Sequence, residues 1–296
     1  MCLCGVTNEG NKISNYSTCV KNWIMSKIKS GDYVLFFYND SKKWLMKVSK
    51  KEQFHSHIGI IKHSDAVGKE FGSRLVTNKD KYVYVLKPSI HDYVMKMQHG
   101  TQIVYPKDFG YIAARTGLQT GQKIVEIGTG SGSLTTFMAS IVSPRGHVHT
   151  FDVETNVMDI AKKNLEKAGM LKYVTMKKQD LKKTKKVPIT DADMVVIDLG
   201  DPWTVLPQAR KMLKGSGFVV AICPTMNQLE KLSIAFVANE FSDIDCTEHI
   251  IRNIEAREGK TRHSFRGIGH TTYLAIARKV FFDKKTTRKK VKKNEE

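Results

Sequence analysis

Apolar residues form short runs between Gly31 and Leu86, with turn residues such as Asn39-Asp40 between them. Short apolar runs at close spacing are typical of strands joined by tight turns. We therefore expect a small β-barrel-like domain over residues 31–90. Its predicted strands are DYVLFF (32–37), KWLMKV (43–48), FHSHIGII (54–61) and YVYVL (82–86).

From residue 91 onward, strand-like runs alternate with amphipathic helical patterns. The apolar run KIVEI (123–127) predicts a buried strand, and apolar residues at i, i+3, i+4, i+7 and i+8 from Leu134 to Val142 predict a helix. Strands alternating with helices imply a mostly parallel α/β sheet with right-handed crossovers. We expect this domain to span residues 91–282, with further strands at 147–153, 173–178, 193–199, 217–223 and 272–277.

The two ends of the chain differ from both domains. Residues 1–30 are polar and irregular, which indicates an N-terminal extension. The last stretch, DKKTTRKKVKKNEE (283–296), holds seven Lys or Arg and three acids. Such a composition predicts a disordered basic tail.

The charge of the chain changes the range of functions to consider. Its 48 Lys and Arg exceed its 29 Asp and Glu, giving a formal net charge of +19. Such an excess favours polyanionic partners through counterion release and long-range attraction. We therefore favour a nucleic-acid partner over a merely salt-adapted surface.

Cysteine usage and hydropathy indicate the compartment. The five cysteines form no CxxC pair, so we expect no metal site, and their odd number fits a reducing environment. The start of the chain lacks the apolar segment of a signal peptide, and no apolar run approaches the length of a membrane span. We expect a cytoplasmic protein with no membrane segment.

The glycine-rich stretch EIGTGSG (126–132) lies directly between the strand at 123–127 and the following helix. Backbone N–H groups at such a junction face an anionic or polar ligand. The spacing of Gly128, Gly130 and Gly132 fits neither a P-loop nor the GxGxxG dinucleotide fingerprint. The pattern ExGxGxG is instead that of class I S-adenosylmethionine methyltransferases, the alternative being a tight turn without a ligand.

Three acids follow three successive predicted strands. Asp152 closes the strand after the glycine loop, where a carboxylate can accept hydrogen bonds from ribose hydroxyls. Asp180 follows the next strand, where it can accept an adenine amino group, and Asp198 faces the crevice at the strand ends. Each acid alone is equally consistent with a helix cap. Three in succession favour a ligand site.

Together with TQIVYPKD (101–108), DLGDPW (198–203), CPTMNQ (223–228) and GHTTYL (269–274), these segments resemble the tRNA adenine-N1 methyltransferases of the TrmI type. The resemblance covers about residues 30–278. It implies a small N-terminal β domain joined to a Rossmann-like class I methyltransferase domain, assembled as a homotetramer or as a related heteromer. It also implies methyl transfer from S-adenosyl-L-methionine to N1 of a T-loop adenine in tRNA, at position 58 and in some archaeal members also 57.

The resemblance also implies roles for individual residues. Val104 and Tyr105 would line the cofactor pocket, with Tyr105 near the target base. Asp198 would hold the target adenine and would also contact the cofactor. The remaining cofactor contacts would be Gly128, Gly130, Ser131, Gly132 and Ser133 around the methionyl part, Asp152 at the ribose, and Asp180 with Leu181 at the cofactor's adenine.

Two departures from the family pattern lie in loops on the substrate side. Glu154 stands where the family usually has an Arg, two places after the acid of the second strand. REGKTRHSF (257–265) replaces the family's late RP segment.

The chemistry of adenine N1 limits what the protein must supply. N1 already has an in-plane lone pair, so the main task is to align it with the methyl group. A carboxylate that accepts a hydrogen bond from N6 stabilises the charge that develops on the ring, which suits Asp198 better than the nearby Asp201. Tyr105 is expected to position the base, while KKQDLKKTKK (177–186) and the basic tail are candidate RNA contacts around an extruded base.

Histidines offer weaker candidates. His270 in GHTTYL is expected to be structural rather than a substrate contact. His55 and His57 are expected on one strand face, without a metal.

Three rival functions remain open at this stage. A protein L-isoaspartate methyltransferase uses a similar glycine loop, but the N-terminal β domain and the basic charge argue against it. A catalytically silent tRNA-binding subunit is disfavoured by the intact loop and Asp152. A DNA adenine-N6 methyltransferase would carry a [DNS]PP[YFW] motif where this chain has DLGDPW.

Overall fold

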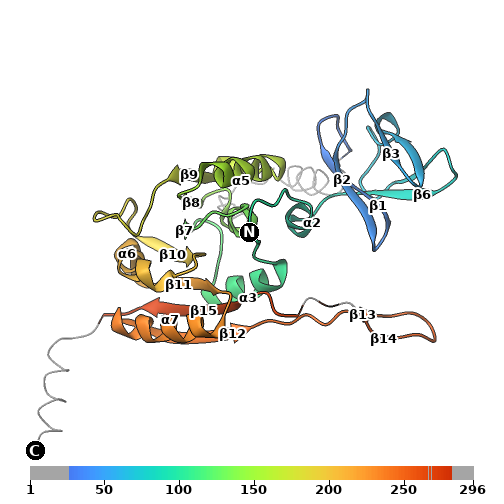
Figure 1. Ribbon diagram of the computed structural model, residues 1–296. Coiled ribbons are helices and arrows are strands. Elements are labelled where there is room, and N and C mark those ends of the chain that lie inside the picture. Colours follow the sequence, from blue (N-terminus) through green and yellow to red (C-terminus); the bar gives the residue numbers. More distant parts are fainter. Residues whose placement is uncertain (1–26, 266, 268, 282–296) are drawn as a thin grey trace, which may run out of the picture. The chain divides into compact units, whose positions relative to one another are not determined.

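The computed structural model describes residues 27–265, 267 and 269–281. The chain divides into two compact units, Met1–Asp92 and Tyr93–Glu296 (Figure 1). Most of the predicted extension 1–30 and all of the predicted tail 283–296 lie outside the described residues.

The N-terminal unit is built from a four-stranded antiparallel sheet in the order β2-β1-β6-β5 and a separate hairpin, β3-β4. Buried and exposed side chains alternate along a strand because successive side chains point to opposite faces of the sheet. In β6, Val83 and Val85 are buried, whereas Tyr82 and Tyr84 are exposed. The strands are β1 (Tyr33–Asn39), β2 (Lys42–Lys47), β3 (Gln53–Ser56), β4 (Gly59–Lys62), β5 (Arg74–Val76) and β6 (Tyr82–Leu86), with a 3-10 turn at His63–Asp65.

The run FHSHIGII does not form the single strand expected from its composition. It folds back on itself as the β3-β4 hairpin, because Gly59 adopts φ +115° and lies against Thr77 and Asn78, where a side chain would collide. His57 therefore lies in the turn, and the expectation that His55 and His57 share a strand face was wrong. His57 Nε2 lies 2.7 Å from Lys42 Nζ.

The second unit contains a seven-stranded sheet in the order β12-β15-β11-β10-β7-β8-β9. The five strands from β7 to β11 are parallel, as predicted, whereas β15 runs antiparallel between β11 and β12. The strands are β7 (Lys123–Ile127), β8 (His147–Asp152), β9 (Val174–Lys178), β10 (Ala192–Ile197), β11 (Leu213–Cys223), β12 (Phe241–Glu248) and β15 (Tyr273–Lys279).

Helices of this unit begin and end at recognisable signals. Helix α3 has Pro106 at its first position and ends at Gly117 with φ +61°. Helix α7 starts with a capping box between Thr225 and Gln228, and it packs against β12 and β15 (Figure 1). The helices are α2 (Ile90–Met95, at the junction of the units), α3 (Pro106–Thr116), α4 (Ser133–Val142), α5 (Thr155–Lys167), α6 (Leu206–Met212) and α7 (Met226–Ala238), with 3-10 turns at Leu171–Tyr173 and Pro202–Val205.

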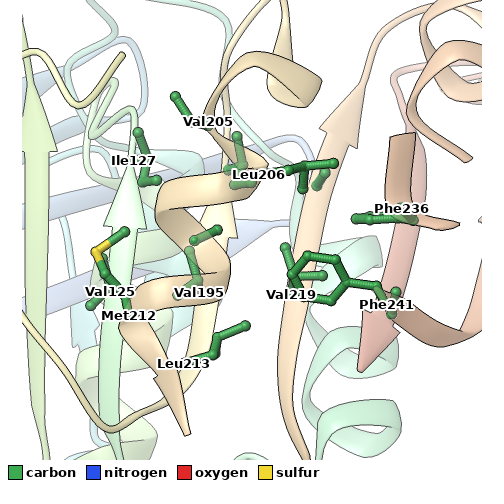
Figure 2. Close-up of a cluster of buried hydrophobic side chains, with 14 of the residues drawn as sticks. Val125, Ile127, Val195, Val205, Leu206, Met212, Leu213, Val219, Phe236 and Phe241 are labelled. Atoms are coloured by element: carbon green, nitrogen blue, oxygen red, sulfur yellow. The ribbon is translucent and has the colours of Figure 1, made fainter. Parts of the chain in front are cut away.

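A continuous apolar core fixes the central strands of the sheet (Figure 2). It joins inward-facing residues of β7, β10 and β11 to α6, α7 and the start of β12. Within it, Ile127 of β7 lies opposite Ile197 of β10, so the carboxyl ends of these two strands are level. The core therefore positions the glycine loop, which follows β7, and the loop that begins at Asp198, which follows β10. Labelled in Figure 2 are Val125, Ile127, Val195, Val205, Leu206, Met212, Leu213, Val219, Phe236 and Phe241.

Between β12 and β15 the chain makes a two-stranded hairpin, β13 (Ile254–Glu255) and β14 (Arg262–His263), which extends beyond the sheet (Figure 1). Across residues 27–265 and 269–281, no helix has the length and apolarity that crossing a membrane requires.

Candidate active site

The glycine loop after β7 is held between the ends of β8 and β10. The amide of Gly128 donates to the Phe151 carbonyl at 2.8 Å, and the amide of Asp198 donates to the Ile127 carbonyl at 2.8 Å. Gly128 has φ +95°, and a β-carbon there would overlap the backbone carbonyl of Asp198. Glycine is thus required where the loop meets the Asp198 strand end.

Asp152, the last residue of β8, fixes the backbone of the loop. Its Oδ2 accepts hydrogen bonds from the amides of Thr129 (2.9 Å) and Gly130 (3.3 Å). Its Oδ1 accepts from the amides of Val153 (2.7 Å) and Glu154 (3.1 Å). All four acceptor positions of this carboxylate are therefore engaged, and a ribose hydroxyl would share or replace the long bond to Gly130.

A cavity of about 150 Å³ opens beside Asp152. Carboxylates of Asp152 and Asp180 supply hydrogen-bond acceptors, while Leu181 is buried in its apolar wall. Apolar walls with a few acceptors suit a nucleoside, whose ring is apolar on its faces and whose amino and hydroxyl groups donate. The lining residues are Ile127, Gly128, Phe151, Asp152, Val153, Gln179, Asp180, Leu181, Lys182 and Leu199.

Lysines surround Asp180 and the rival acid Asp201. The Oδ1 of Asp180 accepts from the amide of Lys182 at 2.9 Å, and Lys183 Nζ lies 3.5 Å from its Oδ2. Lys182 Nζ forms an ion pair with Asp201 at 2.5 Å. Asp201 is thus already matched by a cation, which leaves Asp198 as the better candidate for a substrate contact.

The hydroxyls of Ser131 and Ser133 tie the glycine loop to residues 98–104. Ser131 Oγ accepts from the amides of Gly100 (2.9 Å) and Thr101 (3.2 Å), and Ser133 Oγ donates to the Val104 carbonyl at 2.7 Å. Both side chains are buried. They hold the segment that leads to Tyr105 against the glycine loop.

Asn164 of α5 completes this attachment and was not anticipated from the sequence. Its amide Nδ2 donates to the carbonyls of Gln98 (2.8 Å) and Ser131 (2.9 Å), and its Oδ1 accepts from the amide of Gln98 at 3.0 Å. A polar residue on the buried face of a helix, between Ala161 and Leu165, is the sequence signal that would have indicated it.

Tyr105 lies half-buried at the N-cap of α3, where its carbonyl accepts from the Asp108 amide at 3.0 Å. Asp108 is fully buried and pairs with Lys107 Nζ at 3.0 Å and with His249 Nδ1 at 3.1 Å. A buried carboxylate needs such partners. The YPKD motif therefore anchors Tyr105 to the segment that follows β12.

Burial and mutual repulsion raise the pKa values of two acids at this edge. Burial, and then the charge of Asp152, raise the pKa of the half-buried Asp198 to about 6. Burial raises the pKa of Glu126 to about 8, although Thr135 (2.6 Å) and Thr150 (2.7 Å) donate to its Oε2. Asp198 is therefore mostly ionised at neutral pH, whereas Glu126 is mostly protonated.

His270 joins the ends of β11 and β12. Its Nδ1 lies 2.7 Å from Glu248 Oε1 and its Nε2 lies 2.8 Å from the Pro224 carbonyl. Both partners are acceptors, so the ring must donate from both nitrogens, and the hydrogen bond to Glu248 raises its pKa. This geometry agrees with the structural role expected for it.

Gln179, Lys182 and Leu199 line the cavity but were not predicted. Each is a sequence neighbour of a predicted acid or of Leu181, and this adjacency was the available signal. In the part of the chain that the structure describes, no three His, Cys, Asp or Glu side chains gather as metal ligands would.

The order of the seven strands, the antiparallel β15 and the ExGxGxG loop against the Asp152 strand end together define a class I S-adenosylmethionine-dependent methyltransferase. Residues 81–296 match the family described as the tRNA methyltransferase complex GCD14 subunit. The chain belongs to this family, the TrmI and GCD14 type of tRNA (adenine-N1) methyltransferase.

The chain is also similar to named relatives and to solved structures. The TrmI enzyme of Methanocaldococcus jannaschii, named as acting on tRNA adenines 57 and 58, is 32% identical, covering 83% of this chain and 94% of the relative. TrmI of Aquifex aeolicus is 28% identical with a TM-score of 0.76, covering 87% of this chain and all of that one. A structure titled as a SAM-dependent O-methyltransferase from Thermotoga maritima is 31% identical with a TM-score of 0.82, covering 87% and 96%.

Proposed function

We propose that this protein transfers the methyl group of S-adenosylmethionine to N1 of adenine 58 in tRNA, with adenine 57 as a second target. The observation that supports this most is the placement of Asp198. It is half-buried at the end of β10, and its backbone is locked to the glycine loop beside the cavity that Asp152 and Asp180 line.

The residues around the cavity fit the parts of the cofactor. Asp152 would bind the ribose hydroxyls, and Asp180 with Leu181 would bind the cofactor's adenine. The loop backbone at Gly128, Gly130 and Gly132, which have positive φ, would approach the methionyl part, with Ser131, Ser133 and Val104 holding this wall in place. When bound, S-adenosylmethionine supplies an electrophilic methyl group on its sulfonium.

The protein's own part in the reaction is orientation and charge stabilisation. Asp198 would accept a hydrogen bond from N6 of the target adenine, which makes N1 more electron-rich and stabilises the cation that forms on methylation. Tyr105, fixed by the buried Asp108, would position the extruded base against the cofactor wall.

The surface beside the cavity suits an RNA backbone. Lys182, Lys183, Lys185 and Lys186 are exposed in the segment that directly follows Asp180. Together with the overall charge of +19, they would bind phosphates while the base enters the site.

The assembly and location are part of the same proposal. A homotetramer is implied by family resemblance, and a group of exposed apolar side chains on and beside the β13–β14 hairpin provides a surface for it, because grouped exposed apolar side chains are typical of interaction sites. Those side chains are Ile250, Ile251, Ile254 and Phe265, all more than half exposed. A tRNA substrate would place the protein in the cytoplasm.

The test is direct. Unmodified tRNA transcript is incubated with labelled S-adenosylmethionine, digested and analysed by mass spectrometry for 1-methyladenosine. Transcripts with adenine 57 or adenine 58 replaced by guanine assign the position. Absence of 1-methyladenosine from the wild-type transcript would contradict the proposal. Activity that appeared only after addition of a partner subunit and survived Asp198→Asn would favour a silent subunit.

A further inference from the structure

The β2-β1-β6-β5 sheet of the N-terminal unit has an outward face that the proposed reaction does not use. Across it, Lys43, Phe37, Tyr84 and Arg74 lie in one register row, one residue from each strand. Residues directly opposite each other on neighbouring strands project from the same face. The row therefore places two aromatic rings between two cations.

The opposite face of the same sheet forms the core of this unit. Val34, Phe36, Val83 and Val85 are completely buried there. The residues of the outward row alternate with these core residues along the strands, so they lie on the other face of the sheet. That face is not exposed throughout, because Leu35, which lies between Tyr33 and Phe37 on it, is buried.

A second row extends the aromatic face by one step. Tyr82 lies opposite Val76, and the Arg74 guanidinium sits 4.2 Å from the centre of the Tyr82 ring. Tyr82 is 53% and Tyr84 is 44% exposed. Exposed aromatic rings with a stacked guanidinium are a typical arrangement for binding planar bases.

The charge around these rings is predominantly positive. Lys47 projects from the same face opposite Tyr33, and Lys81 directly precedes Tyr82, with Asp80 as the nearby acid in the turn. Residues 27–92 contain thirteen Lys or Arg and seven Asp or Glu. A second copy meeting this face symmetrically would bring Lys43 and Arg74 of both copies together, which disfavours self-association.

We propose that this face, defined by Phe37, Lys43, Arg74, Val76, Tyr82 and Tyr84, binds unpaired nucleotides of the tRNA substrate. Bases stack on Tyr82 and Tyr84 while Lys43 and Arg74 contact the adjoining phosphates. The inference rests on the proposed function, since it takes tRNA as the substrate. Loss of a stacking partner weakens single-stranded RNA binding by about tenfold or more.

The test compares two double variants of the full chain. Tyr82→Ala with Tyr84→Ala removes the rings, whereas Tyr82→Phe with Tyr84→Phe keeps stacking and loses only the hydroxyls. We expect the alanine pair to raise the Kd and KM for tRNA about tenfold, with kcat and S-adenosylmethionine binding within twofold of wild type. The phenylalanine pair should bind tRNA like wild type. Single Arg74→Gln should lower the salt dependence of tRNA binding, which tests the face even if the alanine pair folds poorly.

Wild-type tRNA affinity in both the alanine pair and Arg74→Gln would overturn the inference. So would a change in molar mass by light scattering in either variant, since this would identify the face as a contact between copies. Failure of the proposed function is a separate result: wild-type protein would then form no 1-methyladenosine, yet the binding comparison would still report on the face.

Discussion

The backbones of Gly128 and Asp198 meet so closely that no side chain fits between them. The peptide chain after β7 passes directly over the carbonyl of the residue that follows β10, and a β-carbon on Gly128 would occupy the position of that oxygen. The glycine loop and the strand end bearing the proposed substrate acid therefore form one unit, and displacing either displaces both.

Gly128→Ala should abolish S-adenosylmethionine binding and destabilise the fold. Alanine at this position has to adopt φ +95° and to push the Asp198 carbonyl away. We therefore expect the free energy of unfolding to fall by more than about 2 kcal/mol. Binding is measured by calorimetry and stability by thermal unfolding. Gly110→Ala is the matched control: Gly110 lies in α3 with open space around it, so alanine there should leave binding unchanged and stabilise the helix by about 0.5–1 kcal/mol. A Gly128→Ala protein with normal cofactor affinity would show that the loop tolerates the shift.

Asp198→Asn should lower kcat by about 100-fold or more, because the amide keeps the shape of the carboxylate without its charge. Cofactor affinity is expected to stay within a few-fold, since Asp152 and Asp180 are unchanged. Single-turnover methylation of tRNA transcript measures the chemical step. Asp201→Asn serves as the comparison, because the Asp201 carboxylate is paired with Lys182. The kcat of this variant should fall much less. The reverse ranking would transfer the proposed role to Asp201.

The pH dependence of kcat/KM should show an acid limb near pH 6. Burial raises the pKa of Asp198 to about 6, and only the ionised carboxylate stabilises a developing cation. Activity should therefore fall about tenfold per pH unit below this value and level off above it. The profile is measured at constant ionic strength, so that tRNA binding is not altered by salt. If the low residual activity of Asp198→Asn kept the same acid limb, another group would be responsible.

Glu126→Gln should gain stability relative to wild type as pH rises. The folded-state pKa of about 8 lies above the usual value of 4.5, so wild-type protein is most favoured below pH 4.5 and loses stability as pH rises towards 8. At about 1.4 kcal/mol per pKa unit, the free energy of unfolding of wild-type protein falls by at most about 5 kcal/mol. Glutamine cannot ionise, so the Glu126→Gln variant does not lose stability in this way as the pH rises. Thermal unfolding at pH 5, 7 and 9 measures the difference, with exposed Glu166→Gln as control. Parallel curves for wild type and Glu126→Gln would contradict the assigned burial effect.

The central strands, and the positions of the acids at their ends, were predictable because each signal is local. KIVEI forms β7 over the predicted residues, and Asp152 closes β8 because apolar runs end where buried strands end. The helix face from Leu134 to Val142 was confirmed for the same reason, since its spacing follows the helical period. These elements suffice to place the sheet edge at which we propose the cofactor binds.

Features that depend on distant partners were not predictable. Strand β12 reads FSDIDCTE, with little apolar character, because an edge strand needs only one neighbour and has most of its residues exposed. The hydroxyls of Ser131 and Ser133, which the motif predicts beside the cofactor, also bind a segment about thirty residues earlier in the chain. Loop-to-segment hydrogen bonds of this kind leave no periodic trace in the sequence.

Strand β15 is among the last described residues of the chain, yet it lies between β11 and β12 inside the sheet. During synthesis, those two strands cannot be joined until residues 273–279 have left the ribosome. Until then β11 has an unpaired edge next to the forming core, and β12 has no strand with which to pair in the seven-stranded sheet. Completion of the catalytic unit is therefore a late event in biosynthesis, and any truncation before residue 273 should yield a chain that chaperones or proteases recognise as unfinished.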